Sequence, residues 1–347
     1  MNARDGSHPA KQPDLGDGSD ELSRDLAAAI PELITAGSED RPDPRNTLND
    51  LTGDRFLYFT KSVLHTAYPS VLGHDLRREH GANKPPQLMA LLIEFFTKTG
   101  MRVLDPFAGV GGTLIGASIA EPGPRAAVGI ELESRWRDIY MQVLLENPRL
   151  LPQPLVAGDC RVVMDGWISG ERASLPDGTD LRSGPGEAQF DFVVMDPPYN
   201  VHLEQTMSGR AGQRYAARHS NRRSDYNMRS EEPGDLANLA SYDEYLAAME
   251  EVFERCFRLL RQGRYMAVIV RDAYQHGEYI FTHVDLARRA QVAGFVPKGE
   301  IVWHQAGARL RPYGYPYGYV PNIVHQHIVI LQRPHERERR RSRCKAG

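Results

Sequence analysis

Apolar runs of strand length alternate with helical segments through most of this chain of 347 residues, and that alternation restricts the fold more than any other feature. The runs of strand length are 101–107, 126–132, 154–160, 190–199 and 264–272. The segments with helical periodicity are 87–100, 113–120, 134–147, 242–263 and 282–295. Strands and helices in alternation build a mostly parallel sheet with helices on both faces, so the sequence predicts an α/β fold.

Two further strands, 297–305 and 322–333, follow each other without a helix between them. Consecutive strands without a crossover helix pair antiparallel. We therefore expect a mostly parallel seven-stranded sheet that ends in an antiparallel hairpin. In such sheets ligands bind beyond the carboxyl ends of the strands, and polar residues at those ends are the first candidates for a site.

Composition divides the chain into three parts. Residues 1–45 are rich in Asp, Gly, Ser and Pro and are expected to form a disordered acidic tail, whereas 46–333 has the composition of one folded domain. Residues 334–347 form an Arg-rich basic tail. Two long segments, 200–241 and 305–322, do not fit the alternation, and loops of that length inside a domain often carry function.

The distribution of apolar residues and cysteines excludes several protein classes. No run approaches the roughly 20 apolar residues of a membrane-spanning helix, and the N-terminal residues lack the apolar core of a signal peptide. Cys160, Cys256 and Cys344 are too few and too scattered for a disulfide framework or a zinc cluster. These features predict a cytoplasmic protein, with no membrane and no metal among its partners.

A glycine-rich turn follows the first strand, in the sequence VLDPFAGVGGT (103–113). It lacks the Gly-Lys-Ser/Thr of a P-loop, and Leu114 stands where a dinucleotide fingerprint has its third glycine. Gly109 and Gly111 let a ligand lie against the backbone, and Asp105 places a carboxylate just before the turn. A carboxylate suits a cationic ligand better than a pyrophosphate. S-adenosylmethionine, which has a sulfonium and an amino group but no phosphate, is therefore the favoured ligand.

Acidic residues also close the next two strands. Glu131 ends the second strand, where a carboxylate can accept both ribose hydroxyls of a nucleoside. Asp159 follows the third strand, where it could accept a hydrogen bond from an adenine amino group. Alone, each is as readily a solvated carboxylate or a turn residue. Carboxylates at the ends of three successive strands are much less expected by chance.

The fourth strand ends in Asp196-Pro197-Pro198-Tyr199-Asn200, the most specific signal in the chain. An exocyclic base amine is a poor nucleophile because its lone pair is delocalised into the ring, so it needs acceptors that favour a tetrahedral nitrogen. The Asp196 carboxylate and the Pro197 carbonyl can supply them, since two prolines stiffen the turn and remove N–H donors. Tyr199 offers a ring on which a flipped base can stack.

Together and in this order, VLDPFAGVGGT, GIELE, GD and DPPYN resemble the S-adenosylmethionine-dependent DNA methyltransferases that modify amino groups of adenine or cytosine. The likeness covers residues 50–333 and includes LTGDRFLYFTKS and HGANKPPQLMALLIEFF upstream. It implies a Rossmann-like class I methyltransferase fold, a catalytic domain over 46–333, S-adenosyl-L-methionine as cofactor and DNA as partner.

The resemblance also assigns roles to individual residues. The residues that it places along the methionine end of the cofactor are Lys84, Pro85 and Pro86. Those of the cofactor loop are Asp105, Phe107, Gly109 and Gly111. The resemblance gives the ribose to Glu131, the adenine to Asp159, and the target base to Asp196, Pro197, Pro198 and Tyr199.

The chain departs from the family pattern in three respects. Gly112 is additional in the cofactor loop, the segment before Lys84 reads HGANKPP, and no separate target-recognition domain follows the catalytic motif. The long loops would then read the DNA, and 305–322, with four tyrosines, is a candidate wall of the base pocket. Segment 200–241 interleaves Arg and Tyr, and the residues expected to bind substrate there are Asn200, Arg214, Arg218, Arg222 and Arg223.

The target of methylation stays open at this point. Adenine N6 is favoured over cytosine N4 because Asp rather than Ser opens the PPY motif, and guanine N2 in RNA is a further alternative. RNA and protein-glutamine methyltransferases usually carry an extra N-terminal domain, for which the first 80 residues are too short and too polar. Methylation of a cytosine ring carbon needs a Cys after Pro, which this chain lacks. A cognate restriction endonuclease is a candidate partner, and the oligomeric state is unspecified.

Overall fold

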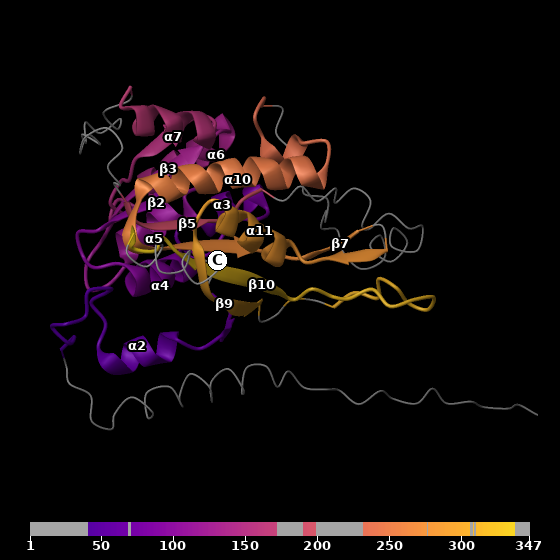
Figure 1. Cartoon of the computed structure of the whole chain (residues 1–347), viewed down its shortest axis with the longest axis horizontal. Coiled ribbons are helices and arrows are strands. Elements are labelled where there is room, and N and C mark those ends of the chain that lie inside the picture. The colour runs from indigo at the N-terminus through magenta and orange to yellow at the C-terminus, as the bar shows by residue number, and fades with distance from the viewer. Residues whose placement is uncertain are drawn as a thin grey trace, which may run out of the picture.

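The computed structural model describes residues 41–68, 71–171, 190–198, 232–275, 277–305, 308 and 310–336 (Figure 1). Its centre is an eight-stranded sheet with the order β1-β9-β10-β6-β5-β2-β3-β4. The strands are β1 Val63–Thr66, β2 Arg102–Asp105, β3 Ala126–Glu131, β4 Leu155–Ala157, β5 Phe190–Met195, β6 Leu260–Val270, β9 Val296–Gln305 and β10 His325–Gln332. Every neighbouring pair is parallel except the two that include β10. The predicted α/β fold, mostly parallel sheet and antiparallel terminal hairpin are confirmed.

Helices cover both faces of this sheet. They are α2 Gly53–Phe59, α3 His74–Arg77, η1 Arg78–His80, α4 Pro86–Phe96, α5 Gly112–Ile119, α6 Ser134–Glu146, α7 Cys160–Ser169, η2 Leu236–Asn238, α10 Tyr242–Leu259 and α11 Thr282–Val292. Side chains of β5 alternate between two cores: Phe192 and Val194 pack with α4, α5 and α6, while Val193 and Met195 pack with α7, α10 and α11. Among the described residues, no helix combines the length and apolar character needed to cross a bilayer.

The sheet has one strand more than the seven predicted. The additional strand, β1, lies at the edge and pairs parallel with β9, from Val63 opposite Val302 to Thr66 opposite Gln305. Its four side chains alternate between exposed and half-buried positions. A short edge strand of this kind lacks the continuous apolar run by which the central strands were predicted, so it leaves no recognisable pattern in the sequence.

Two predicted elements end earlier than the sequence pattern indicates. The helix over 242–263 stops at Leu259, because Leu260 pairs with Phe190 of β5 and is fully buried there. The apolar period continues past this point, but strand pairing overrides it. The strand over 154–160 is reduced to Leu155–Ala157, because Asp159 caps the N-terminus of α7.

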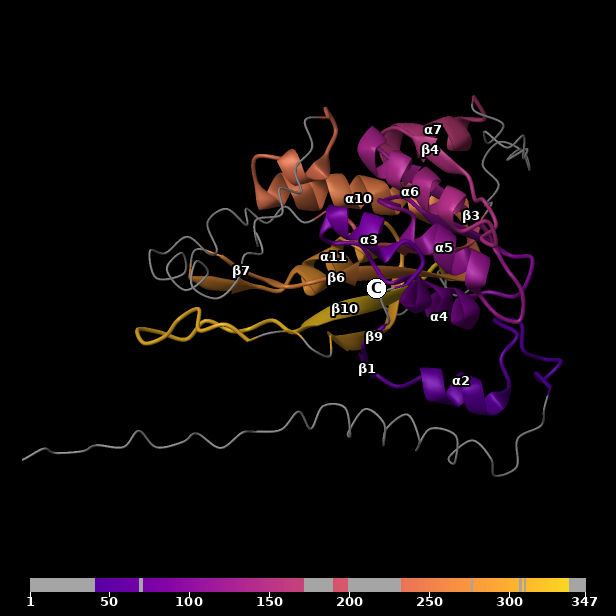
Figure 2. The same ribbon diagram turned by 180° about the vertical axis from the view of Figure 1, so that it is seen from behind.

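Two segments project beyond the carboxyl ends of the strands, in the same direction in both views (Figures 1 and 2). One is a hairpin of β7 Ala273–Gln275 and β8 Glu278–Ile280, which the sequence did not predict. The other, residues 310–322, is closed at its base by the side chain of Asn322, which hydrogen-bonds the backbone N–H (2.7 Å) and C=O (2.8 Å) of Arg311. We call these two segments the arms.

Candidate active site

A cavity of about 200 Å³ opens at the carboxyl edge of the sheet, beyond β2, β3 and β5. It brings together most of the residues that the sequence singled out. Those that line it are Lys84, Asp105, Phe107, Gly109, Glu131, Asp159, Asp196, Pro197 and Pro198. Parallel strands end at one edge, so residues far apart in the sequence meet here, as the position of the motifs predicts.

The two glycines of the turn serve different purposes. Gly109 (φ +52°) lines the cavity, and its backbone N–H donates to Glu131 Oε2 at 2.8 Å. A Cβ at Gly109 would lie 3.3 Å from the His80 ring. Gly111 (φ +77°) is not among the lining residues, and a Cβ there would lie 2.2 Å from the Tyr140 ring. Gly109 therefore provides backbone access to the cavity, and Gly111 permits α6 to pack against the turn.

Two buried carboxylates, Asp105 and Glu131, face the cavity. Burial raises the pKa of each to about 7, although hydrogen-bond donors oppose the shift. Asp105 accepts from the Thr113 hydroxyl and from the Phe107 N–H (2.9 Å), and Glu131 accepts from the backbone N–H groups of Gly109 and Glu133 (2.8 Å each). Burial disfavours the charged form of these two acceptor groups. A cationic or hydroxyl-bearing ligand is therefore favoured in the cavity over an anion.

Asp196, the first residue after β5, forms an ion pair with the Lys84 ammonium group. Both side chains are largely buried, at 17% and 6% exposure respectively, so the pair is shielded from water. Lys84 Nζ also lies 3.3 Å from the Ala82 carbonyl. Lys84 consequently lies at the Asp196 end of the cavity, whereas Pro85 and Pro86 begin α4 and are not among the lining residues.

Asp159 lines the cavity but its carboxylate is already engaged. It accepts the backbone N–H of Arg161 at 2.8 Å and the Arg161 guanidinium at 2.7 and 3.2 Å. It therefore acts in this structure as the helix cap that its turn position suggests. Its second carboxylate oxygen can still accept another bond.

Sequence reasoning missed several lining residues. His80, from η1, packs its buried ring edge-on against Trp136, with the ring centres 4.7 Å apart, and burial lowers its pKa to about 4. Asp235, the N-cap of η2, and Leu236, its first residue, close another side. No local pattern marks His80 or Asp235. Trp136 could have been found, because it lies in the first turn of the helix after Glu131.

The remaining predicted site residues lie outside the part of the chain that the structure describes. They are Tyr199, Asn200, Arg214, Arg218, Arg222 and Arg223. So does most of the long segment 200–241, of which the structure describes 232–241. The assignments made for them stay predictions.

Comparison with known proteins places this geometry in context. A family model described as DNA methylase, for N6- and N4-specific methyltransferases, matches residues 44–142 and 190–342. The match therefore includes the glycine turn, Glu131 and the end of β5, but not Asp159. "Putative methylase YubD" of Escherichia coli (strain K12) is 38% identical over 87 residues, which is 24% of this chain and 37% of YubD.

Solved structures with a similar fold include two from Thermus thermophilus. TrmN aligns with 72% of this chain and 48% of its own length, at 14% identity and a TM-score of 0.39. TTHA0409 from the same organism, solved in complex with S-adenosyl-L-methionine, aligns with 51% of this chain and 54% of its own length, at 21% identity and a TM-score of 0.31. The chain thus spans about half the length of these proteins, and about a third of YubD.

Proposed function

Because this chain belongs to the DNA methylase family of N6- and N4-specific methyltransferases, we propose that it methylates an exocyclic amino group of a DNA base, with S-adenosyl-L-methionine as methyl donor. Adenine N6 is the favoured target, and cytosine N4 the alternative. The target base would leave the duplex stack to reach the cavity. One observation carries this proposal: the residue after β5, Asp196, opens into the same cavity as Asp105 and Glu131.

The lining residues fit the cofactor. Asp105 and Glu131 are buried acceptors that a cationic ligand would stabilise in their ionised form, and Gly109 leaves its backbone accessible. S-adenosyl-L-methionine supplies an activated methyl group on a sulfonium. We assign the ribose to Glu131. Each of its carboxylate oxygens accepts one backbone N–H and keeps a lone pair for a ribose hydroxyl. We assign the adenine end of the cofactor to Asp159.

At the other end of the cavity, Asp196 and the Pro197 carbonyl are the proposed acceptors for the two amino hydrogens of the base. Holding both hydrogens turns the nitrogen lone pair out of conjugation with the ring. Lys84 pairs with Asp196 and so fixes the direction of its carboxylate. Lys84 also offsets part of the negative charge of a cavity lined by five further carboxylates, those of Asp105, Glu131, Glu133, Asp159 and Asp235. Most of the rate acceleration comes from this positioning and charge complementarity.

DNA contacts outside the cavity are assigned to the Arg-rich segment and to the arms. In the Arg-rich segment 200–241, the proposed DNA contacts are Asn200, Arg214, Arg218, Arg222 and Arg223. In the second arm, Tyr315, Tyr317 and Tyr319 are 80%, 96% and 85% exposed, which is unusual for large aromatic side chains. Exposed rings suit stacking on unpaired bases.

The substitution Asp196→Asn tests the proposal, because it removes the carboxylate charge with little change in shape. We expect methyl transfer to DNA to slow by about 100-fold or more, in the range seen when one positioned polar group is lost. Cofactor affinity, measured by calorimetry, should stay close to that of the wild type. The matched control is Asp165→Asn on α7, an exposed aspartate paired with Arg255, which should methylate normally.

The product decides between the targets. Digestion of methylated DNA to nucleosides, followed by mass spectrometry, distinguishes N6-methyladenine from N4-methylcytosine, and a parallel reaction with RNA detects N2-methylguanine. If Asp196→Asn methylates DNA at the wild-type rate, the proposed mechanism is wrong. Methylation of RNA but not of DNA would replace the proposed substrate.

A further inference from the structure

A fully buried arginine, Arg77, lies just outside the cavity at the end of α3. Only 1% of its surface is exposed, and no acidic side chain among the described residues forms an ion pair with it. Its Nε atom is buried without a hydrogen-bond partner. Burial lowers its pKa to about 10, so the side chain is still charged at neutral pH. A hydrocarbon side chain would fill this space without the cost of burying a charge, so the reason for an arginine lies in what its guanidinium holds.

The guanidinium of Arg77 holds the main chain at Lys84. Its Nη2 atom donates to the Lys84 carbonyl at 2.5 Å and to Asn83 Oδ1 at 3.1 Å. The Asn83 side-chain amide donates in turn to the Arg77 carbonyl at 2.9 Å. Arg77 and the segment 83–84 are therefore joined in both directions across η1, and the position of the Lys84 main chain depends on Arg77.

The cofactor turn comes against the same Lys84 carbonyl. A Cβ at Gly112 would lie 2.9 Å from that carbonyl oxygen and 3.8 Å from Arg77 Nη2, so any side chain at Gly112 would displace the group that Arg77 holds. Gly112 and the segment HGANKPP are two of the respects in which this chain departs from the family pattern. In the structure the two departures meet, and the additional glycine leaves room for the Lys84 carbonyl.

The main-chain position at Lys84 determines where its side chain ends. The ammonium group forms the ion pair with Asp196 and lies 3.3 Å from the Ala82 carbonyl. A lysine side chain is flexible, so an ion pair of fixed direction needs a fixed main chain behind it. Arg77 does not line the cavity. It can influence Asp196 only through Lys84.

We propose that Arg77 is a positioning residue for methyl transfer, which acts through Lys84 on the Asp196 carboxylate. Arg77, Asn83 and Gly112 together support the Lys84 main chain, and the Lys84 ammonium group then keeps the carboxylate directed toward the target amine. This inference rests on the proposed function and adds no chemical step to it. A displacement of about 1 Å at a reacting group can slow a reaction by about 100-fold, so a support outside the cavity can affect the rate.

The test is a double-mutant cycle on the rate of methyl transfer that combines Arg77→Lys with Lys84→Met. Arg77→Lys keeps the charge and removes the planar guanidinium. We expect kcat to fall by about 10-fold or more in the single variant, with cofactor affinity by calorimetry close to that of the wild type. In the Lys84→Met background the same substitution should leave kcat unchanged, because the ammonium group through which Arg77 acts is already lost.

Gly112→Ala keeps the test valid if Arg77→Lys fails to fold. It leaves Arg77 in place and displaces the Lys84 carbonyl instead. We expect the same pattern, a lower kcat with Lys84 present and no further loss in the Lys84→Met background. The unfolding temperature of each variant is measured on the same samples.

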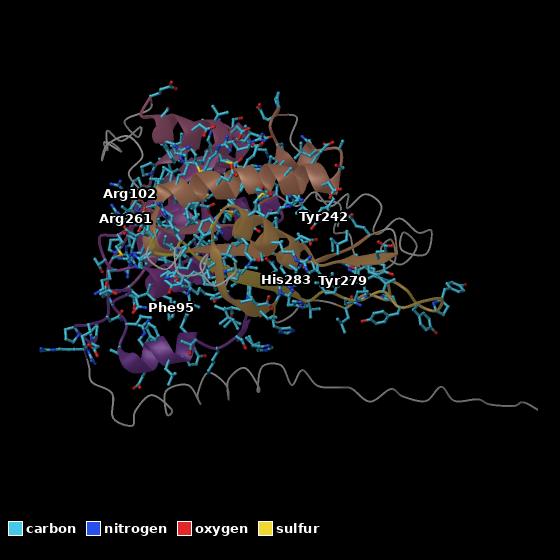
Figure 3. The ribbon with its side chains drawn as sticks, in the orientation of Figure 1. Phe95, Arg102, Tyr242, Arg261, Tyr279 and His283 are labelled. Carbon is cyan, nitrogen blue, oxygen red and sulfur yellow. The ribbon has the colours of Figure 1, made fainter. Side chains whose placement is uncertain are left out.

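The matched control is Arg125→Lys. Arg125 is also 1% exposed, and its guanidinium also holds a backbone carbonyl, that of Glu121, at 2.8 Å. It lies at the opposite edge of the sheet, because Ala126, the next residue, pairs in register with Arg102. Figure 3 shows Arg102 at that edge, away from Tyr279. This variant should lose stability, as Arg77→Lys does, and should methylate at the wild-type rate while folded.

A second measurement needs no substrate. The Lys84 amine of the free protein is labelled with an amine-reactive reagent, and the rate is followed by peptide mass spectrometry. Lys84 should react several-fold faster in Arg77→Lys and Gly112→Ala than in the wild type or in Arg125→Lys. An unchanged labelling rate would overturn the inference, and so would an equal loss of kcat with and without the Lys84 ammonium group. If the wild type methylates no DNA, the proposed function is wrong, and labelling still decides whether Arg77 holds Lys84.

Discussion

The carboxyl edge of the sheet has two halves with opposite character. Beyond β2, β3 and β5 lies the cavity, in which buried carboxylates accept backbone N–H groups. Beside the ends of β6 and β9 and the start of β10 lie the stacked rings of His283 and His327 and the two arms, one of which exposes three tyrosines almost fully. Under the proposed function, the first half holds the cofactor and the target base, and the second half contacts the DNA.

The largest expected effect is confined to the cavity half. Gly109→Val places a branched side chain at φ +52°, against His80, in a residue that lines the cavity. We expect S-adenosylmethionine affinity, measured by calorimetry, to fall by about 100-fold or more, because steric overlap adds to backbone strain of about 1–3 kcal/mol.

Gly170→Val is the matched control for backbone strain. Gly170 also has a positive φ, +79°, but no described atom lies within 4 Å of its Cβ position and it does not line the cavity. This variant should lose stability and keep cofactor affinity. If Gly109→Val binds the cofactor normally while folded, the cavity is not the cofactor site.

The second prediction concerns Gly111, in the same turn as Gly109, where we expect a substitution to lower stability rather than cofactor affinity. Gly111→Ala would bring a Cβ to 2.2 Å from the Tyr140 ring, which is fully buried. We expect the free energy of unfolding to fall by about 2–4 kcal/mol, from strain and overpacking. Urea denaturation measures it, and Tyr140→Leu should recover part of the loss in the double variant. If Gly111→Ala has normal stability but low cofactor affinity, Gly111 contacts the cofactor, as the sequence predicts.

The two halves were not equally predictable from the sequence. Asp105, Glu131 and Asp196 each follow a strand within a short motif, so the period of the chain sufficed to place them at one edge. His283 and His327 come together only because β10 inserts antiparallel between β6 and β9, a pairing of distant segments that no local pattern records.

The same reasoning explains the errors in the elements. Leu260 continues a helical period, yet its pairing with Phe190 places it in β6. The edge strand β1 and the β7–β8 hairpin are too short to show a period of their own. The central strands are long apolar runs, which the sequence pattern predicts. Elements whose bounds depend on pairing with distant segments leave no such pattern.

A smaller effect should appear in the arm half. Replacing Tyr315, Tyr317 and Tyr319 with Ser removes three exposed rings. If they stack on DNA, affinity should fall by about 10-fold, at the lower end of what loss of base–aromatic stacking costs. Fluorescence anisotropy with a labelled duplex measures it, and cofactor affinity and unfolding temperature should not change. Tyr58→Ser, on α2 and 46% exposed, is the control. Equal DNA affinity of the triple variant and this control would leave the arm without a role in recognition.

The pH dependence of stability returns to the cavity, and its sign is fixed by burial. Burial raises the pKa of Glu131 from its ordinary value of 4.5 to about 7 in the folded state. Between these values the native state holds a proton that the unfolded chain has lost, so stability falls as pH rises. The contribution is fully present below the unfolded pKa and is lost as pH rises through the folded pKa.

Glu131→Gln removes this dependence, so its stability relative to the wild type should increase between pH 5 and pH 7 by up to about 1.4 kcal/mol per pH unit. His80, whose lowered pKa has the opposite sign, is present in both proteins, and its effect cancels in the difference. The Glu131 charge contributes to the raised pKa of Asp105, so the variant also weakens the pH dependence of Asp105, which adds to the difference with the same sign. Urea denaturation at each pH measures that difference. A difference that does not change with pH would mean that Glu131 is ionised in the folded protein throughout this range. The cavity would then hold a compensated charge, as the other half of the edge does, where Asp272 and Glu300 each face the two imidazoles of His283 and His327.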